Sequence, residues 1–216
     1  MEKELQKRIL SSIIIAPIAF FFIIKGSIFF ILFLVILFLL ASLEWTKMSN
    51  KIEFKIIGII FLFFSFYSVY FVRNINVSDF LLILLICITT DIGGYVFGKI
   101  FKGPKLTKIS PNKTYSGMIG GFLLSIVVSY FFLEKYGSIL EEQNFSSKIL
   151  YVFIVILISS ISQIGDLIIS YIKRLSKIKD TGKLLPGHGG LLDRIDGMIF
   201  AFPFAYIIYS LNILKF

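Results

Sequence analysis

Long apolar runs separated by short polar segments dominate the chain. A helix that crosses the hydrocarbon core of a bilayer needs roughly 20 apolar residues. Seven runs approach this length, and they cover residues 9–24, 27–43, 55–72, 79–100, 116–133, 149–172 and 191–214. The pattern predicts an all-α, polytopic integral membrane protein with about seven transmembrane helices, within a range of roughly six to nine. Pro17 and Pro203 fall inside predicted spans, where membrane helices tolerate proline.

The composition supports this interpretation. Hydrophobic residues make up 57% of the 216 residues, and 25 of them are Phe. A water-soluble domain of this size cannot bury so much apolar surface. We therefore expect a single membrane domain over residues 1–216, with N-terminal helices in 1–87 and a catalytic part in 88–216. No small-residue cleavage site follows the first run, so a cleaved signal peptide is not expected, and Cys87 is expected to be a small core residue.

The basic residues predict the topology. The formal net charge is +9, and most of the 22 Lys and Arg residues lie in four polar segments. These segments are the N-terminus, 44–55, 99–115 and 173–190. The positive-inside rule places all four in the cytoplasm and the C-terminus outside. One missed helix would move the C-terminus, but it would not separate the two long loops 99–115 and 173–190. Nucleic acid is not an expected partner, because no basic soluble module is present.

Carboxylates inside the apolar runs indicate a functional site. They belong to Asp91, Asp166, Asp193 and Asp196. A carboxylate within a membrane costs several kcal/mol unless it is paired or hydrated. Asp193 and Asp196 have the i, i+3 spacing of one helix face, and Asp166 and Ser170 have the i, i+4 spacing. The sequence therefore predicts that three carboxylates from two helices meet in a polar cavity on the cytoplasmic side.

The expected cavity has the chemistry of a magnesium and phosphate site. Carboxylate oxygens suit Mg²⁺, which completes its coordination shell with water and phosphate. Glycine-containing loops allow backbone N–H groups to approach an anion. Basic residues that suit phosphates lie nearby in the sequence, and they are Lys105, Lys113, Lys173, Arg174, Lys179 and Arg194. Together these features suggest phosphoryl or nucleotidyl transfer at a membrane surface.

Each of these features also has a structural alternative. Asp166 and Asp193 could form buried ion pairs with Lys173 or Arg194, and the loop lysines could serve only to set topology. Gly120 and Gly121 are more typical of close helix packing, whereas Gly93 and Gly94 suit either packing or ligand approach. His188 could be a hydrogen-bonding loop residue, and Asp180 a solvated charge.

One long motif carries a family resemblance. The segment SYIKRLSKIKDTGKLLPGHGGLLDRID, residues 170–196, resembles the signature of the phosphatidate cytidylyltransferases, also called CDP-diacylglycerol synthases. The matching positions are Ser170, Lys173-Arg174, Lys179-Asp180, His188-Gly189-Gly190 and Asp193-Arg194-Ile195-Asp196. DIGGYVFGKIFKGPKLTKISPNKT, residues 91–114, and GDL, residues 165–167, are similar to further blocks of the family. The resemblance covers residue 88 to the C-terminus. The chain departs from it at Tyr115-Ser116-Gly117, where the family has Trp-Glu-Gly, and at Ile169, where the family has Glu.

The resemblance implies a reaction, in which CTP and phosphatidate give CDP-diacylglycerol and pyrophosphate. It implies Mg²⁺ on Asp166, Asp193 and Asp196, with a second, monovalent cation as an open possibility. Lys173, Arg174 and Arg194 would bind phosphates at the reacting centre. The other substrate-binding candidates are Asp91, Ser110, Lys113, Thr114, Ser170, Lys179, Asp180, His188, Gly189 and Gly190. The implied location is the cytoplasmic membrane of a bacterium, with the active site facing the cytoplasm and a homodimer as a possible assembly.

Three other functions use similar residues. A CDP-alcohol phosphotransferase needs Arg and further Asp residues after its Asp-Gly pair, and none follows Asp196-Gly197. A CTP-dependent polyprenol kinase stays open, because it also binds CTP. A transporter that uses Asp91 and Asp166 as relays is disfavoured, because the sequence shows no repeated halves.

Overall fold

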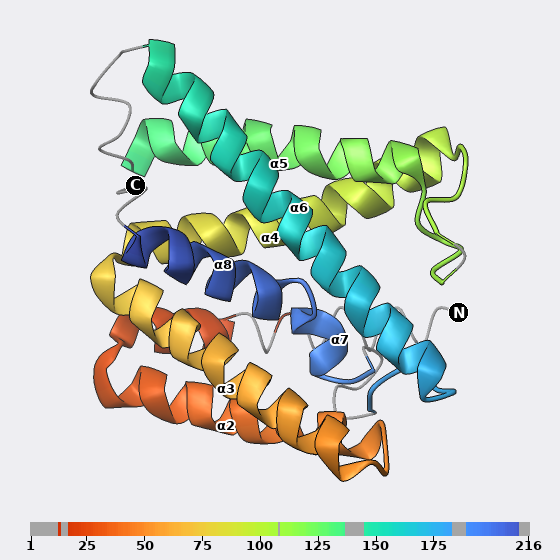
Figure 1. Ribbon diagram of the computed structural model, residues 1–216. Coiled ribbons are helices and arrows are strands. Elements are labelled where there is room, and N and C mark those ends of the chain that lie inside the picture. The colour runs from red at the N-terminus through yellow and green to blue at the C-terminus, as the bar shows by residue number, and fades with distance from the viewer. Residues whose placement is uncertain (1–12, 14–16, 108, 137–144, 183–188, 212–216) are drawn as a thin grey trace. The chain divides into compact units, whose positions relative to one another are not determined.

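The structure is a computed structural model that describes residue 13 and residues 17–107, 109–136, 145–182 and 189–211. Within these ranges the regular elements are helices, and a strand-like bridge pairs Lys105 with Thr114. The predicted all-α class is confirmed. Residues 17–25 are helical. The helices that follow are α2 (Ser27–Lys47), α3 (Ile52–Ile75), α4 (Val77–Phe101), α5 (Tyr115–Tyr136), α6 (Phe145–Leu175), α7 (Leu192–Ile195) and α8 (Met198–Ser210) (Figure 1).

Five of the described helices, α2 to α6, are long and apolar enough to cross a membrane. Their large apolar side chains point outward in many places. Ile57, Phe63 and Phe101, for example, are 66%, 64% and 67% exposed. Such surfaces are stable only against lipid, so the chain is a multi-pass membrane protein.

The five predicted spans between residues 27 and 172 are confirmed, with ends that differ by a few residues. The largest shift that matters for the site is in α2, which continues to Lys47 instead of ending at residue 43. The first predicted span, 9–24, lies largely outside the described residues.

The last predicted span, 191–214, is wrong as a continuous helix. α7 ends at Ile195, and α8 begins at Met198. Between them the Asp196 carboxylate accepts a hydrogen bond from the N–H of Gly197 at 2.9 Å. An Asp side chain that bonds local backbone competes with helix formation, and the following glycine weakens the helix further.

Contacts among the described helices divide the chain into two compact units. The α2 unit contains the residues up to Tyr70 together with Ile172–Ile195, and the α4 unit contains Phe71–Tyr171 together with the residues from Asp196 onward. The segment 172–195, which holds most of the family motif, therefore groups with the N-terminal helices.

In the α2 unit, a tryptophan joins the C-terminal end of α2 to the start of α3. The indole of Trp45 donates a hydrogen bond to the Phe54 carbonyl at 3.0 Å and stacks on the Phe54 ring. Gly58 faces the indole so closely that a Cβ there would overlap the ring. The end of α2, which carries Glu44, is thereby fixed against α3.

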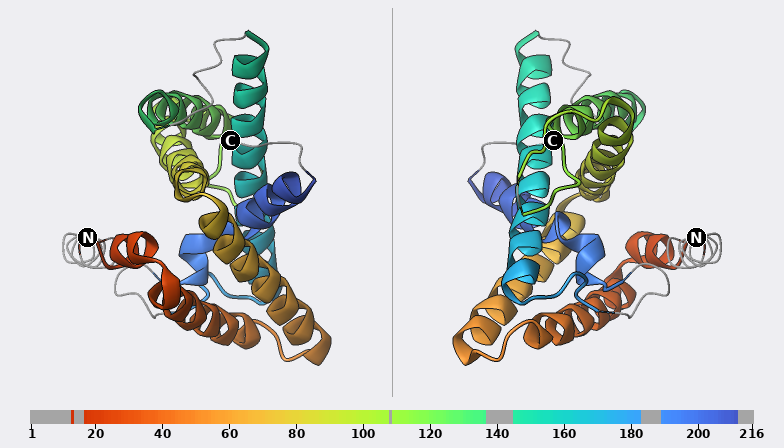
Figure 2. Two further views of the ribbon diagram at one scale, coloured as in Figure 1. Left: turned by 90° about the vertical axis from the view of Figure 1, so that its left-hand side faces the viewer. Right: turned by 90° about the vertical axis from the view of Figure 1, so that its right-hand side faces the viewer.

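In the α4 unit, α4 and α5 lie side by side (Figures 1 and 2). Glycines allow their backbones to touch. A Cβ on Gly93 would lie 2.5 Å from the carbonyl oxygen of Gly120, and a Cβ on Gly117 would lie 2.6 Å from that of Gly94. The packing role predicted for Gly120 is confirmed, and Gly93 shares it.

Hydroxyl groups tie the other helices of the α4 unit to α4. The hydroxyls of Thr90 on α4 and Ser159 on α6 are 2.7 Å apart and hydrogen-bonded. The Tyr209 hydroxyl of α8 donates to the buried Asp79 carboxylate at the start of α4. The first contact positions α6, the helix that carries Asp166, and the second positions α8.

The glycine contact between α4 and α5 predicts contrasting effects of two neighbouring alanines. Gly93→Ala places a methyl group against backbone that cannot move aside, so we expect a loss of about 1–3 kcal/mol in the free energy of unfolding. Gly94→Ala is the matched control, because its Cβ would meet only a carbonyl oxygen at 3.8 Å. Thermal unfolding of both variants in detergent, followed by circular dichroism, should give a lower midpoint only for Gly93→Ala. Equal midpoints would contradict close packing at Gly93.

Candidate active site

Asp166 lies on α6 within the α4 unit, and its carboxylate is paired. Its Oδ2 forms an ion pair with the ammonium of Lys113, and the side chains of Lys113 and Asp166 are 26% and 27% exposed. One turn later on α6, the Ser170 hydroxyl donates to Oδ1 at 3.3 Å. The predicted i, i+4 contact between Asp166 and Ser170 is confirmed. Lys113, from the polar loop between α4 and α5, was not predicted to be the partner of Asp166.

The loop between α4 and α5 holds Lys113 through backbone hydrogen bonds. The N–H of Leu106 donates to the Lys113 carbonyl at 2.8 Å, and the N–H of Lys113 donates to the Ser110 carbonyl at 3.0 Å. The second bond closes a tight turn over Pro111, a residue whose fixed φ suits such turns. Thr114 then caps α5, because its hydroxyl accepts the N–H of Gly117 at 3.1 Å. Ser110 and Thr114 thus have clear roles in shaping this loop.

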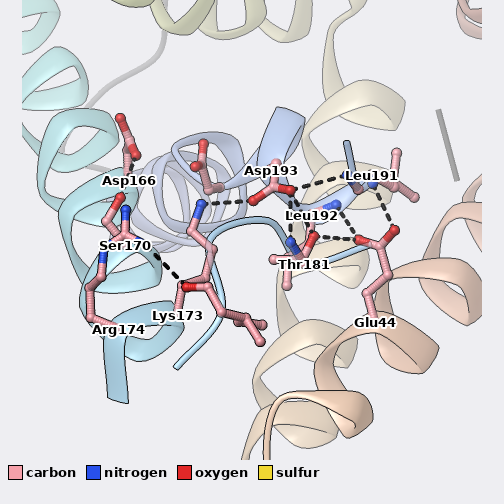
Figure 3. A network of polar contacts seen from close by, with 12 residues as sticks. Glu44, Asp166, Ser170, Lys173, Arg174, Thr181, Leu191, Leu192 and Asp193 are labelled. Carbon is pink, nitrogen blue, oxygen red and sulfur yellow. Dashed lines mark hydrogen bonds and ion pairs between the residues drawn. The ribbon is translucent and has the colours of Figure 1, made fainter. Parts of the chain in front are cut away.

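Asp193 lies on α7 within the α2 unit, and donors surround its carboxylate (Figure 3). Oδ1 accepts from the Lys173 ammonium at 2.7 Å, and the two side chains are only 11% (Lys173) and 8% (Asp193) exposed. Oδ2 accepts from the N–H of Thr181 at 2.9 Å and from the N–H of Gly190 at 3.1 Å. The Thr181 hydroxyl also lies 3.1 Å from Oδ2. The buried pair with Lys173, one of the two structural alternatives, is present.

These contacts determine the protonation of Asp193. Burial alone raises the pKa of its carboxyl, but the Lys173 ammonium and the N–H groups of Thr181 and Gly190 outweigh burial, so the pKa lies below its ordinary value. Gly189 lies beside the Asp193 carboxylate and has φ +86°, and a Cβ on it would lie 3.2 Å from Oδ2. A glycine is therefore required there by backbone conformation.

The remaining predicted residues differ in exposure. Arg174, Lys179, Asp180, Arg194 and Asp91 are exposed. The Arg174 guanidinium donates to the Ile178 carbonyl at 3.1 Å, near the end of α6. Asp196 is buried, and because α7 ends at Ile195 it does not share one helix face with Asp193 as predicted. His188 lies outside the described residues.

The fit of Mg²⁺ can be judged from the chemistry of the donors. Among the described residues, no three His, Cys, Asp or Glu side chains are gathered as a ready-made metal site. Asp166 and Asp193 nevertheless offer hard oxygen donors of the kind that Mg²⁺ prefers, and each is paired with a lysine ammonium. The donor chemistry fits the ion, although Asp193 would have to exchange one of its present donors for it.

The sequence pattern does not identify two residues that take part in the hydrogen bonds around Asp193. Glu44 of α2 accepts hydrogen bonds from Thr181, Leu191 and Leu192, and neither Glu44 nor Thr181 was a candidate. The apolar run ends at residue 43, so the pattern predicts that Glu44 lies in the loop 44–55. The available signal was an acidic residue directly after an apolar run and before a tryptophan.

The chain matches the model described as "Cytidylyltransferase family" over residues 54–212. It is similar to the phosphatidate cytidylyltransferase of Rickettsia felis, with 33% identity over 213 residues, 96% of this chain and 93% of that protein. The protein of the same name from Rickettsia bellii is 34% identical over 97% of this chain and 93% of its own length. That from Bacillus subtilis is 34% identical over 75% of this chain and 60% of its own length.

The buried pair between Lys173 and Asp193 predicts a large effect on stability. In Lys173→Ala the carboxylate stays buried without its cation, which typically costs about 3 kcal/mol or more in the free energy of unfolding. Lys177→Ala, at an exposed position four residues further on, is the control. Thermal unfolding in detergent can be followed by the fluorescence of the single tryptophan, Trp45. A midpoint for Lys173→Ala equal to that of Lys177→Ala would show that the pair does not stabilise the fold.

Proposed function

Since the chain belongs to the cytidylyltransferase family, we propose that it transfers the cytidylyl group of CTP to phosphatidate and forms CDP-diacylglycerol and pyrophosphate. The observation that carries this proposal is the similarity to proteins named phosphatidate cytidylyltransferase across nearly the whole chain. The ion pairs of Asp166 with Lys113 and of Asp193 with Lys173 in a membrane protein support it, because one substrate is a lipid and the other a polyanion.

The proposed reaction is an in-line displacement at phosphorus. A phosphate oxygen of phosphatidate attacks the α-phosphorus of CTP, a new P–O bond forms, and the bond to the pyrophosphate leaving group breaks. The attacking oxygen is already ionised, so no strong general base is needed. The protein mainly has to align the substrates and neutralise their charge.

The basic residues have roles in this scheme. The side chains of Arg174 and Arg194 are exposed and can reach phosphates, whereas Lys173 is buried against Asp193 and would act close to it. Lys113 is proposed to contact the nucleotide from the loop between α4 and α5, with Ser110 and Thr114 shaping that loop. The other predicted substrate contacts stay predictions.

Mg²⁺ is the proposed cofactor, with Asp166, Asp193 and Asp196 as its proposed ligands. Bound Mg²⁺ supplies positive charge for the phosphate oxygens of the substrates. The second, monovalent cation stays a prediction.

The proposed location is the cytoplasmic membrane of a bacterium, with the active site toward the cytoplasm. Support comes from the basic loops 99–115 and 173–190, which the positive-inside rule assigns to that side. A homodimer stays a prediction from the family resemblance.

Labelled CTP separates the proposed reaction from that of a polyprenol kinase. We expect purified protein with phosphatidate and Mg²⁺ to move the label of α-³²P-CTP into the lipid extract, while the label of γ-³²P-CTP leaves in pyrophosphate. Chelation of Mg²⁺ should stop the transfer. A kinase would instead place the γ-label in a polyprenol, so γ-label in lipid, or no label with phosphatidate, would overturn the proposal.

Asp166→Asn tests the proposed role of that carboxylate. The amide keeps the size of the side chain but removes the charge that would bind Mg²⁺, so we expect kcat to fall by about 100-fold or more. Glu134→Gln, which removes an exposed carboxylate near the end of α5, is the control and should retain activity. The same labelled assay measures both, with unfolding midpoints as a check on folding. Near-normal turnover in folded Asp166→Asn would exclude the residue as an essential ligand.

A further inference from the structure

A buried carboxylate in the N-terminal helices holds the family motif. Glu44 lies on α2, one turn before its end, and only 3% of the residue is exposed. Its Oε1 accepts the N–H of Leu191 at 2.9 Å, and its Oε2 accepts the N–H of Leu192 at 2.8 Å. The Thr181 hydroxyl also contacts Oε2, at 2.8 Å. All four residues belong to the α2 unit.

The backbone around Glu44 is shaped for this contact. A Cβ on Gly182 would lie 2.6 Å from Oε1, and a Cβ on Gly190 would lie 2.5 Å from Oε2. Any side chain at either position would push the carboxylate away. Gly190, the last residue of the His-Gly-Gly motif, is therefore explained by the approach of Glu44 and Thr181.

Thr181 links Glu44 to the signature aspartate. Its hydroxyl lies 2.8 Å from Oε2 of Glu44 and 3.1 Å from Oδ2 of Asp193, and its N–H donates to the same Oδ2. A hydroxyl has one proton, so it can donate to only one of the two carboxylates at a time. The position of Asp193 thus depends on a residue that Glu44 also holds.

We propose that Glu44 is a positioning residue, which fixes Thr181, Leu191 and Leu192 and through them the orientation of Asp193. Glu44 lies on α2, outside the residues 54–212 that the family model matches. The proposal therefore adds α2 to the elements that support the site. The expected effect on turnover rests on the proposed function. The hydrogen bonds from the Leu191 and Leu192 amides to Glu44 do not depend on it.

The test compares variants of the full-length protein in detergent. Glu44→Gln keeps the size of the side chain but turns an NH₂ group toward donors. Thr181→Val removes the shared hydroxyl, and Thr181→Ser restores it. Glu53→Gln, at an exposed acid of α3, controls for lost charge, and Gly93→Ala controls for lost stability. The α-labelled CTP assay gives kcat and KM, and hydrogen exchange measures the amides of residues 189–195.

We expect Glu44→Gln to lower kcat roughly 10- to 100-fold, as lost positioning contacts commonly do, while both KM values change less than about threefold. Amide exchange at Leu191 and Leu192 should be at least about tenfold faster. Thr181→Val should show the same split and Thr181→Ser should recover most of the loss. The double variant that combines Glu44→Gln with Thr181→Val should have a kcat no lower than that of the slower single variant, because both substitutions act through one contact.

Several results would overturn the inference. One is a kcat for Glu44→Gln within about twofold of wild type. Another is a loss of activity that merely follows the unfolding midpoint, as in Gly93→Ala. If Glu44→Gln does not fold, unchanged kcat in folded Thr181→Val decides against the inference. If the wild-type protein transfers no α-label, the proposed function is refuted instead. The exchange rates of the Leu191 and Leu192 amides then show by themselves whether Glu44 holds these residues.

Discussion

A carboxylate removed from water must be given hydrogen-bond donors, and the α2 unit meets this requirement for Glu44 and Asp193 with two short pieces of chain, residues 181–182 and 189–192. Backbone N–H groups of Thr181, Gly190, Leu191 and Leu192 all point at one or the other carboxylate. Because buried acceptors without partners are costly, neither piece can move without breaking several bonds together. Their own backbone N–H groups therefore hold these two pieces in place as much as side chains do.

The same requirement explains why the structural and functional interpretations of the aspartates are compatible. Asp166 and Asp193 each lie against a lysine, as a purely structural ion pair would. An enzyme that binds polyphosphates needs lysines held at defined places, and a carboxylate paired with each lysine holds it there. The ion pairs thus keep the lysines ordered when no substrate is bound.

Sequence patterns predicted those features of the fold that depend on local composition. Apolar runs located α2 to α6, and the i, i+4 spacing located the contact between Ser170 and Asp166. Two features depended on competition that hydropathy does not register. The Asp196 side chain and Gly197 interrupt the last apolar run, and α2 continues through polar residues to Lys47 because Trp45 packs on α3. The extension of α2 buries Glu44, which the apolar pattern places in a loop.

Tertiary pairing was the other limit. The partner of Asp166 is Lys113, and nothing in the spacing of the motifs distinguishes it from several other lysines. Its place depends on the folded loop between α4 and α5, in which backbone bonds at Leu106 and Ser110 orient the lysine. Pairings of this kind follow from the shape of the chain, so they become visible only once that shape is known.

The separation between Glu44 and its partners has a consequence for synthesis of the protein. Thr181, Leu191 and Leu192 follow Glu44 by 137, 147 and 148 residues. A nascent chain leaves the ribosome from its N-terminus, so α2 enters the bilayer long before these donors are translated. Throughout that interval the Glu44 carboxylate needs water or lipid headgroups instead. Because Glu44 lies one turn from the end of α2 and not in its middle, water or headgroups can reach the carboxylate more easily during that interval.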